Sequence, residues 1–390
     1  MRFRSKGLVA AVAMAVPLGV FGGGTAFAVT AQHTAPGYRV TTVLSGQSLT
    51  HTFTTAAGTS GQEHLAFPDD ITVLYGIFYV TFQNGVGPQG QASADGNRDS
   101  TIVAFTSQGR RVGQWDLRGK CDGLTADPWT GQVIATVNED ANSSLYTIDP
   151  DAQPGGQVQH YAYNEPLPHK GGTDAISVYD GHLLISASAP GTTGAAAPNA
   201  AYPAVYDVSL DEQAHVATVQ PLFYDEALAT TANSGVAAGN VVRLALTDPD
   251  SNEVVPDVSP RFRGDFMLTS QGDQEQIYVS RAGTRNQALS VLSLSQSVDD
   301  TAWAASSHGR LYATDTGGDT VDVVTGWFRP GTAFVAVTPC DSNSAPATCP
   351  APPAYPANYL GVLNMSTGQI DPVTVGGATL QPQGLLFVSL

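Results

Sequence analysis

Apolar and polar residues alternate with a period of two through most of the chain, in short runs rich in branched and aromatic side chains. One set of such runs is GIFYVTF (76–82), STIVAFT (100–106) and RVGQWDL (111–117). Gly, Asn, Asp and Pro separate the runs, so the pattern predicts short strands joined by turns. One segment, DEALATTA (225–232), is the best candidate for a helix. The chain is therefore expected to be all-β.

The strands recur in units, and each unit opens with Asp, one further residue and then an apolar residue. The starts are Asp69-Asp70-Ile71, Asp122-Gly123-Leu124, Asp174-Ala175-Ile176, Asp265-Phe266-Met267, a weaker Asp299-Asp300-Thr301 and a degenerate Gln383-Gly384-Leu385. The wider gap between Asp174 and Asp265 implies an insertion. Four-stranded units of about 50 residues predict a β-propeller, whose blades stack because one blade cannot bury both faces.

The number of blades and the closure of the ring also follow from the repeat. The starts number six, whereas the length of the chain divided by the unit slightly favours seven, with 331–375 as a separate blade. The last start runs out after one strand. The N-terminal segments YRVTTVL (38–44) and SLTHTFTT (48–55) are then expected to complete the last blade, leaving no open sheet edge.

The first 28 residues have a basic head, an apolar centre and the exit Ala26-Phe27-Ala28. This order predicts a secretory signal peptide at 1–28, followed by a single propeller domain at 29–390 that is secreted. A membrane anchor is the alternative, but Pro17 and the glycines at 22–24 shorten the apolar centre below a spanning length.

The net charge limits the partners that the protein can bind, and the cysteines indicate the environment in which it works. The formal charge of −17 becomes −20 without the leader, which excludes nucleic acid and anionic membranes as partners. We expect a monomer that meets a small molecule, an extracellular protein or a carbohydrate. Cys340 and Cys349 bracket a polar loop and are predicted to form a disulfide. Cys121 is left over and is interpreted as a buried thiol.

Two stretches, PDDI…GIFYVTF…STIVAFTSQG and DDTAWAASSHGRLYATDTGGDTVDVVT, resemble the blades of NHL-repeat and gluconolactonase-like propellers. The resemblance covers about half of the chain, blade by blade. It implies the fold, but this scaffold carries hydrolases, lyases and binding proteins alike. It further implies a divalent metal near the axis, because gluconolactonase-like propellers hold one with acidic and amide side chains.

The repeated acid is the first candidate for a site. The first strand of a propeller blade lines the channel, so these residues are expected to ring one mouth: Asp69, Asp122, Asp174, Asp265 and Asp299. Carboxylate oxygens suit Ca²⁺ or Mg²⁺. Alternatively, each Asp accepts backbone N–H bonds and holds neighbouring blades together. Both hypotheses stay open.

Three further residues are candidates for catalysis at the same mouth. His64 and His169 each lie five residues before a repeated Asp, and Glu139 follows a strand of the second blade. An imidazole can act as a general base or a metal ligand, although two solvated loop histidines are the alternative. With a metal, this set would suit lactone hydrolysis or a lyase elimination.

Two functions therefore remain. The first is a secreted propeller that binds a ligand or partner at the channel mouth. The second is a hydrolase or lyase that depends on a divalent metal. No catalytic signature such as G-x-S-x-G or H-E-x-x-H occurs in the sequence, which favours binding.

Overall fold

The computed structural model describes residues 37–168, 171–188, 201–235, 237–339, 357–377 and 380–390. The predicted signal peptide, His169 and the Cys340–Cys349 pair lie outside these ranges. Within them the regular structure is strands and one short 3₁₀ turn, η1 (Gly46–Ser48). No helix in the described ranges has the length and apolar character needed to cross a membrane.

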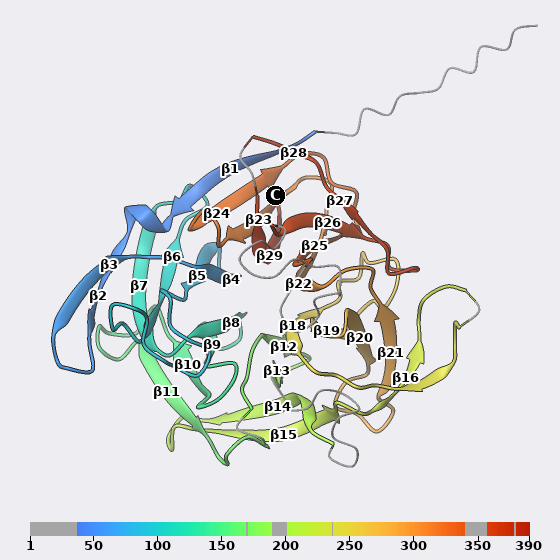
Figure 1. The fold of residues 1–390 in the computed structure, drawn as a ribbon, viewed down its shortest axis with the longest axis horizontal. Helices are drawn as coiled ribbons and strands as arrows, with labels where there is room; N and C mark the ends of the chain where they lie inside the picture. Colours follow the sequence, from blue (N-terminus) through green and yellow to red (C-terminus); the bar gives the residue numbers. More distant parts are fainter. Residues whose placement is uncertain (1–36, 169–170, 189–200, 236, 340–356, 378–379) are drawn as a thin grey trace, which may run out of the picture. The chain divides into compact units, whose positions relative to one another are not determined.

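The main strands fall into groups that follow one another around a centre (Figure 1), and we number these groups sheets 1 to 6. Each is given from its innermost strand outward. Sheet 1 holds β4 (Pro68–Leu74), β5 (Ile77–Phe82), β6 (Asp99–Phe105) and β7 (Arg111–Arg118). Sheet 2 holds β8 (Cys121–Asp127), β9 (Gln132–Val137), β10 (Ser144–Ile148) and β11 (Val158–Tyr163). Sheet 3 holds β12 (Ile176–Tyr179), β13 (His182–Ser186), β14 (Pro203–Asp211) and β15 (Val216–Tyr224), and β15 also pairs with β11.

The remaining three groups are larger or less regular. Sheet 4 holds β18 (Pro249–Val254), β19 (Phe266–Ser270), β20 (Glu275–Ser280), β21 (Ala288–Ser293), β16 (Leu228–Thr231) and β17 (Val241–Arg243). Sheet 5 holds β22 (Val298–Trp303), β25 (Ala333–Val337), β26 (Tyr359–Leu363) and β27 (Ile370–Pro372). Sheet 6 holds β29 (Pro382–Ser389), β23 (Gly309–Asp315), β24 (Thr320–Thr325), β1 (Tyr38–Ser45) and β28 (Val375–Gly376).

The predicted helix at 225–232 is strand β16 instead. Along it Leu228 is exposed, Ala229 is buried and Thr230 is exposed. This alternation has the period of a strand, and β16 pairs with β21 and β17. Tertiary pairing therefore overrides the helical preference of the alanines and leucine.

The last two sheets are interleaved along the chain. After β22 the chain leaves sheet 5, forms β23 and β24 in sheet 6, and returns to sheet 5 as β25. The sequence pattern places GRLYATD (309–315) next to the Asp299 strand, but this segment is β23 and pairs with β24 and β29.

The two ends of the described chain meet in sheet 6. Strand β1 pairs with β24, and β29 pairs with β23 on the inner side. The second predicted N-terminal strand does not join this sheet. It is β2 (Thr50–Thr54), which forms a hairpin with β3 (Ser60–His64). His51 of β2 is buried against Glu63 of the hairpin and Asp116 of β7, at 2.9 and 3.2 Å.

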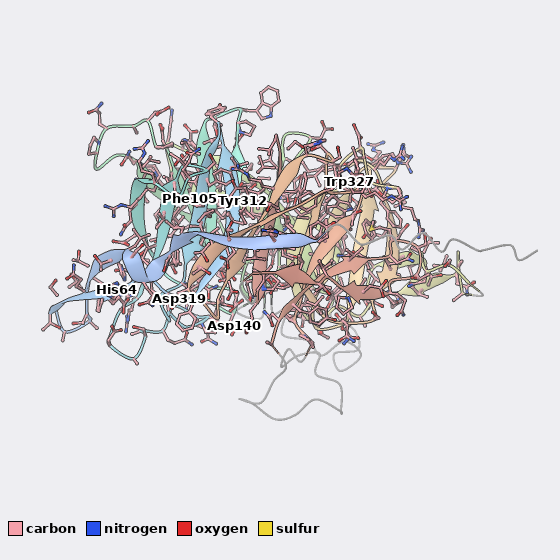
Figure 2. All side chains as sticks on the ribbon, turned by 90° about the horizontal axis from the view of Figure 1, so that it is seen from above. His64, Phe105, Asp140, Tyr312, Asp319 and Trp327 are labelled. Carbon is pink, nitrogen blue, oxygen red and sulfur yellow. The ribbon has the colours of Figure 1, made fainter. Side chains whose placement is uncertain are left out.

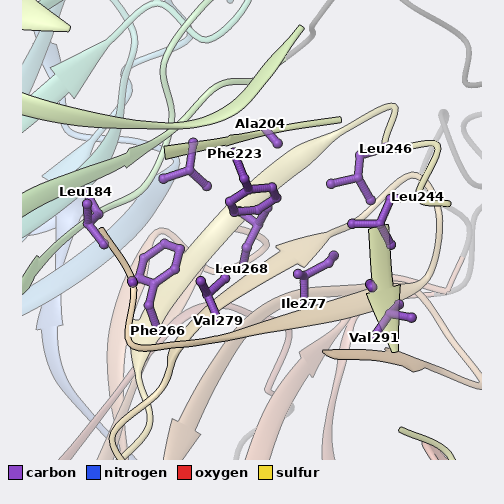
Figure 3. Close-up of a cluster of buried hydrophobic side chains, with 13 residues drawn as sticks. Leu184, Ala204, Phe223, Leu244, Leu246, Phe266, Leu268, Ile277, Val279 and Val291 are labelled. Atoms are coloured by element: carbon purple, nitrogen blue, oxygen red, sulfur yellow. The ribbon is translucent and has the colours of Figure 1, made fainter. Parts of the chain in front are cut away.

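The hydrophobic core is divided among the contacts between sheets. Each of six buried clusters joins two consecutive sheets, and the sixth joins sheet 6 to sheet 1 through residues such as Tyr312 and Phe78. Figure 3 shows the cluster between sheets 3 and 4, which includes Phe223 of sheet 3 and Phe266 and Leu268 of sheet 4. The apolar side chains are buried in the contacts between sheets. The starts of the inner strands can therefore carry polar residues.

Candidate functional site

Most of the inner strands begin with the same irregularity. In four of them the pairing register shifts between the first and fourth residues: Pro68/Ile71, Cys121/Leu124, Pro249/Asn252 and Val298/Thr301. Such a bulge re-aims the side chains of the extra residues. The second residue of each start is acidic or an amide: Asp69, Asp122, Asp174, Asp250, Asp299 and Gln383. These six, which we call the ring residues, all line one cavity of about 1040 Å³, the central cavity.

Sheet 4 contributes Asp250 to the ring, so the prediction of Asp265 is wrong. Asp265 directly precedes β19, and β19 pairs with both β18 and β20, which makes it a second strand. The repeat hid Asp250 because three polar residues follow it in place of an apolar one. A signal was present, since Pro249 precedes Asp250 as Pro68 precedes the first ring residue.

Hydroxyl groups on second strands fix the backbone of the ring. The Thr136 hydroxyl of β9 accepts the N–H of Gly123 at 3.0 Å and donates to the carbonyl of Asp174 in the next sheet. Thr314 of β23 likewise donates to the carbonyl of Asp69 in sheet 1. The junctions between sheets 2 and 3 and between sheets 6 and 1 thus position a ring residue through the same kind of bond.

The staple between blades is made by the carboxylate after the ring residue. Asp70 accepts the N–H of Ile71 at 2.6 Å and of Leu124 in sheet 2 at 2.7 Å. Asp300 accepts the N–H of its own next residue and that of Leu385 in sheet 6, both at 2.6 Å. The stapling hypothesis therefore describes Asp70 and Asp300 rather than the ring positions before them.

The wall of the central cavity is strongly acidic. Eleven carboxylates line it: Asp69, Asp70, Asp122, Glu139, Asp140, Asp174, Asp248, Asp250, Glu253, Asp299 and Asp300. Among the described residues that line it, the single base is Lys120. Carboxylates that share a concave site with walls of low dielectric constant add to one another's negative potential. The cavity therefore favours a positively charged occupant.

Lys120 is already committed to two of these carboxylates. Its ammonium lies 2.7 Å from Asp122 Oδ1 and also pairs with Glu139. Burial opposes its charge, but Asp122 and Glu139 outweigh burial and hold the pKa of Lys120 well above its usual range. Lys120 is therefore a charged internal counter-ion that the repeat pattern did not reveal.

Burial also disfavours charge on the ring carboxyls. It raises the pKa of Asp69 to about 8, against the opposing effect of Lys120. Burial likewise raises the pKa values of Asp122, Asp174 and Asp250 well above their usual range. A bound cation would lower these pKa values, because it stabilises the charged forms.

Several buried polar atoms on this wall have no hydrogen-bond partner. They are Asp122 Oδ2, Asp250 Oδ2, Ser251 Oγ and Asn252 Oδ1. Three of the side chains belong to consecutive residues of β18. Buried polar groups are nearly always hydrogen-bonded, so each such atom marks a missing partner.

The predicted catalytic residues separate in the structure. Glu139 lines the central cavity. His64 lies at the end of the β2–β3 hairpin, exposed, with its Nδ1 3.1 Å from the Leu49 carbonyl oxygen. Figure 2 shows His64 and Asp140 toward one side of the sheets and Trp327 toward the other. No described histidine lines the central cavity.

The leftover cysteine is a structural residue. Cys121 is a free thiol with none of its surface exposed. Burial, together with Asp122 and other nearby carboxylates, raises the pKa of its thiol well above the usual range. This confirms the interpretation of Cys121 as a buried thiol.

The donor types of the cavity suit Ca²⁺ or Mg²⁺, but their arrangement does not fit a preassembled metal site. In the part of the chain that the structure describes, no three His, Cys, Asp or Glu side chains gather closely enough to hold a metal ion. Calcium takes six to eight oxygens at about 2.3–2.6 Å. The carboxylates instead are distributed over the strands around the cavity.

Comparisons with known proteins give distant structural matches alone. No model of a known family matches the chain, and no curated protein matches its sequence. Among solved structures, a periplasmic gluconolactonase of Pseudomonas aeruginosa is 13% identical, with a TM-score of 0.42, over 90% of this chain and 99% of that one. A putative 6-phosphogluconolactonase of Bacteroides fragilis is 11% identical, with a TM-score of 0.40, over 92% and 99%. A streptogramin B lyase is 10% identical, with a TM-score of 0.38, over 86% and 90%.

These neighbours are β-propeller proteins, and the likeness is one of fold. At this level of identity it carries no argument about activity.

Proposed function

We propose that the chain is a secreted β-propeller that binds a positively charged ligand in its central cavity. The observation that carries this proposal is the charge of the cavity: its described lining residues include eleven carboxylates and one base, Lys120, which is already paired with Asp122 and Glu139. Unpartnered acceptors on the same wall supply places for a ligand to donate hydrogen bonds.

The finer architecture that we infer is six blades rather than the seven that chain length favoured. Six sheets each contribute one ring residue to the central cavity, and six apolar clusters join consecutive sheets. On this basis β1 and β29 complete the sixth blade with strands from both ends of the chain. Chain length favours seven blades if segment 331–375 forms a blade of its own. This segment instead supplies strands to both sheet 5 and sheet 6.

A second candidate is a hydrolase or lyase that uses a divalent metal. One observation favours it: burial raises the pKa of Asp69 to about 8, so this carboxyl can exchange a proton near neutral pH. Lys120 and Glu139 lie on the same cavity wall. Elemental analysis of the purified protein tests the metal, and one tightly held divalent ion per chain would favour this candidate.

Thermal melts at constant ionic strength test the binding proposal. The secreted form is melted with Ca²⁺, Mg²⁺ or spermidine and compared with an Asp174→Asn/Asp250→Asn variant. We expect at least one cation to raise the melting temperature of the unmodified protein more than that of the variant, because binding to the folded state stabilises it. An Asp265→Asn variant, which loses a charge outside the cavity, is the matched control. Equal shifts in all three proteins, or none, contradict the proposal.

A further inference from the structure

The ligand class can be narrowed from the unpartnered atoms of the central cavity, and this step rests on the proposed function. These atoms lie on two separate parts of the wall, β8 of sheet 2 and β18 of sheet 4. Sheet 3 lies between them in the order of sheets, with Asp174 on its inner side.

The first part is centred on Asp122. Its side chain is 4% exposed, and its Oδ1 accepts from Gln83 at 2.9 Å and from Lys120 at 2.7 Å. Its Oδ2 has no hydrogen-bond partner. A buried carboxylate oxygen without a donor is costly, so this atom needs an N–H group or a cation.

The second part is formed by residues 250–252. Asn252 is 4% exposed and uses both amide hydrogens, on the Ala175 carbonyl at 2.7 Å and the Ser186 hydroxyl at 2.8 Å. Its Oδ1 lacks a donor, as does Asp250 Oδ2. Ser251 is 8% exposed, and its hydroxyl is also unpartnered. Residues 250–252 thus supply three buried oxygens without a hydrogen-bond partner on one stretch of the cavity wall.

A single metal ion does not satisfy both parts. It would have to draw oxygens from two non-adjacent sheets to bonding distance, and the described carboxylates form no cluster that can hold a metal. A cavity of about 1040 Å³ instead has the volume of sites that hold organic molecules.

We infer that the central cavity binds a linear organic polycation, with one ammonium group at Asp122 and a second at residues 250–252. Lys120 offsets part of the charge near Asp122, so the second position, which has no base among its lining residues, holds the ligand more strongly. The carbon chain between the two ammonium groups crosses the cavity past sheet 3.

Isothermal titration calorimetry with spermidine, 1-aminobutane and CaCl₂ at physiological ionic strength tests this inference. We expect spermidine to bind one per chain, and 1-aminobutane at least about tenfold more weakly, because it fills only one of the two positions. Asp250→Asn keeps the shape of the side chain and removes its charge, and we expect it to weaken spermidine about tenfold.

Asp265→Asn is the control variant and should leave the affinity unchanged. If Asp250→Asn fails to fold, as judged by its melt, Asp122→Asn replaces it, with a smaller expected loss of spermidine affinity because Lys120 already offsets part of the charge of Asp122. Equal affinities for spermidine and 1-aminobutane overturn the inference. Tight binding of Ca²⁺ with none of spermidine also overturns it, yet leaves the proposed function standing. Binding of no cation overturns both.

Discussion

At the scale of single residues, the charge balance of the central cavity depends on Lys120. It is the base that offsets Asp122, whose side chain is almost fully buried, and Glu139. Removing such a base is strongly destabilising, because its carboxylate partners then stay buried without a compensating positive charge. The sequence could predict four of the five ring acids, but not Lys120, whose role comes from contacts and not from a repeated position.

Replacing Lys120 by Met should lower the free energy of unfolding by roughly 3–5 kcal/mol at pH 7, the usual result of breaking one side of a buried ion pair. Urea unfolding measures the loss. Adding Asp122→Asn to Lys120→Met should recover part of it, because the orphaned charge is removed. A loss below about 1 kcal/mol, as for an exposed pair, contradicts this view of the site.

Asp69 gives a prediction about pH. Its pKa rises from 3.8 to about 8 on folding, so the folded state binds more protons than the unfolded state between these values. The contribution of Asp69 is complete below the unfolded pKa and is lost as pH rises through the folded one. We therefore expect the free energy of unfolding to fall between about pH 5 and pH 8.5, and to fall less in Asp69→Asn. Parallel curves for both proteins argue against the shift.

At the scale of elements, the bulged start of an inner strand determines which side chains line the central cavity. The bulge puts a ring residue into the cavity wall, and the next residue staples the neighbouring sheet where it is Asp70 or Asp300. The alternation of the strands and the spacing of most starts were readable from the sequence. Sheet 4 was not, because its inner strand continues with polar residues that find their partners in sheet 3, as Asn252 does.

Removing the stapling carboxylate of Asp300 should destabilise the contact between sheets 5 and 6. Asp300→Ala leaves the N–H groups of Thr301 and Leu385 without their acceptor. We expect a loss of roughly 2–3 kcal/mol in urea unfolding, the range for buried groups left unsatisfied. Asp371→Ala, on the exposed face of β27, is the control and should change stability by less than about 0.5 kcal/mol. Equal effects from both changes would contradict the staple.

At the scale of the whole molecule, sheet 6 is assembled from distant parts of the chain. Thr42 of β1 hydrogen-bonds Asp322 of β24 at 2.6 Å, across 280 residues of sequence. The sequence indicated that both ends would share a sheet region, because each end carried strands without local partners. It could not show the interleaving of β22 to β25, since adjacent strands in a sequence usually pair with each other.

A chain that begins at Gly46 lacks β1 and exposes the edge of β24. We expect it to associate through this edge, seen as oligomers in size-exclusion chromatography, because an unpaired strand edge recruits other strands. A synthetic peptide of residues 37–45 should restore the monomer by adding the missing strand. A chain that begins at Gly37 is the control. A stable monomer without β1 or the peptide would count against its role.

The interleaving of sheets 5 and 6 also sets an order of assembly during synthesis. Sheets 1 to 4 use consecutive segments and can form as the polypeptide emerges from the ribosome or an export channel. Sheet 5 has to wait until the β23–β24 hairpin has passed, and sheet 6 is complete only when the final residues are free. Until β24 has been synthesised β1 has no partner, so the nascent chain carries an unpaired strand through most of its synthesis.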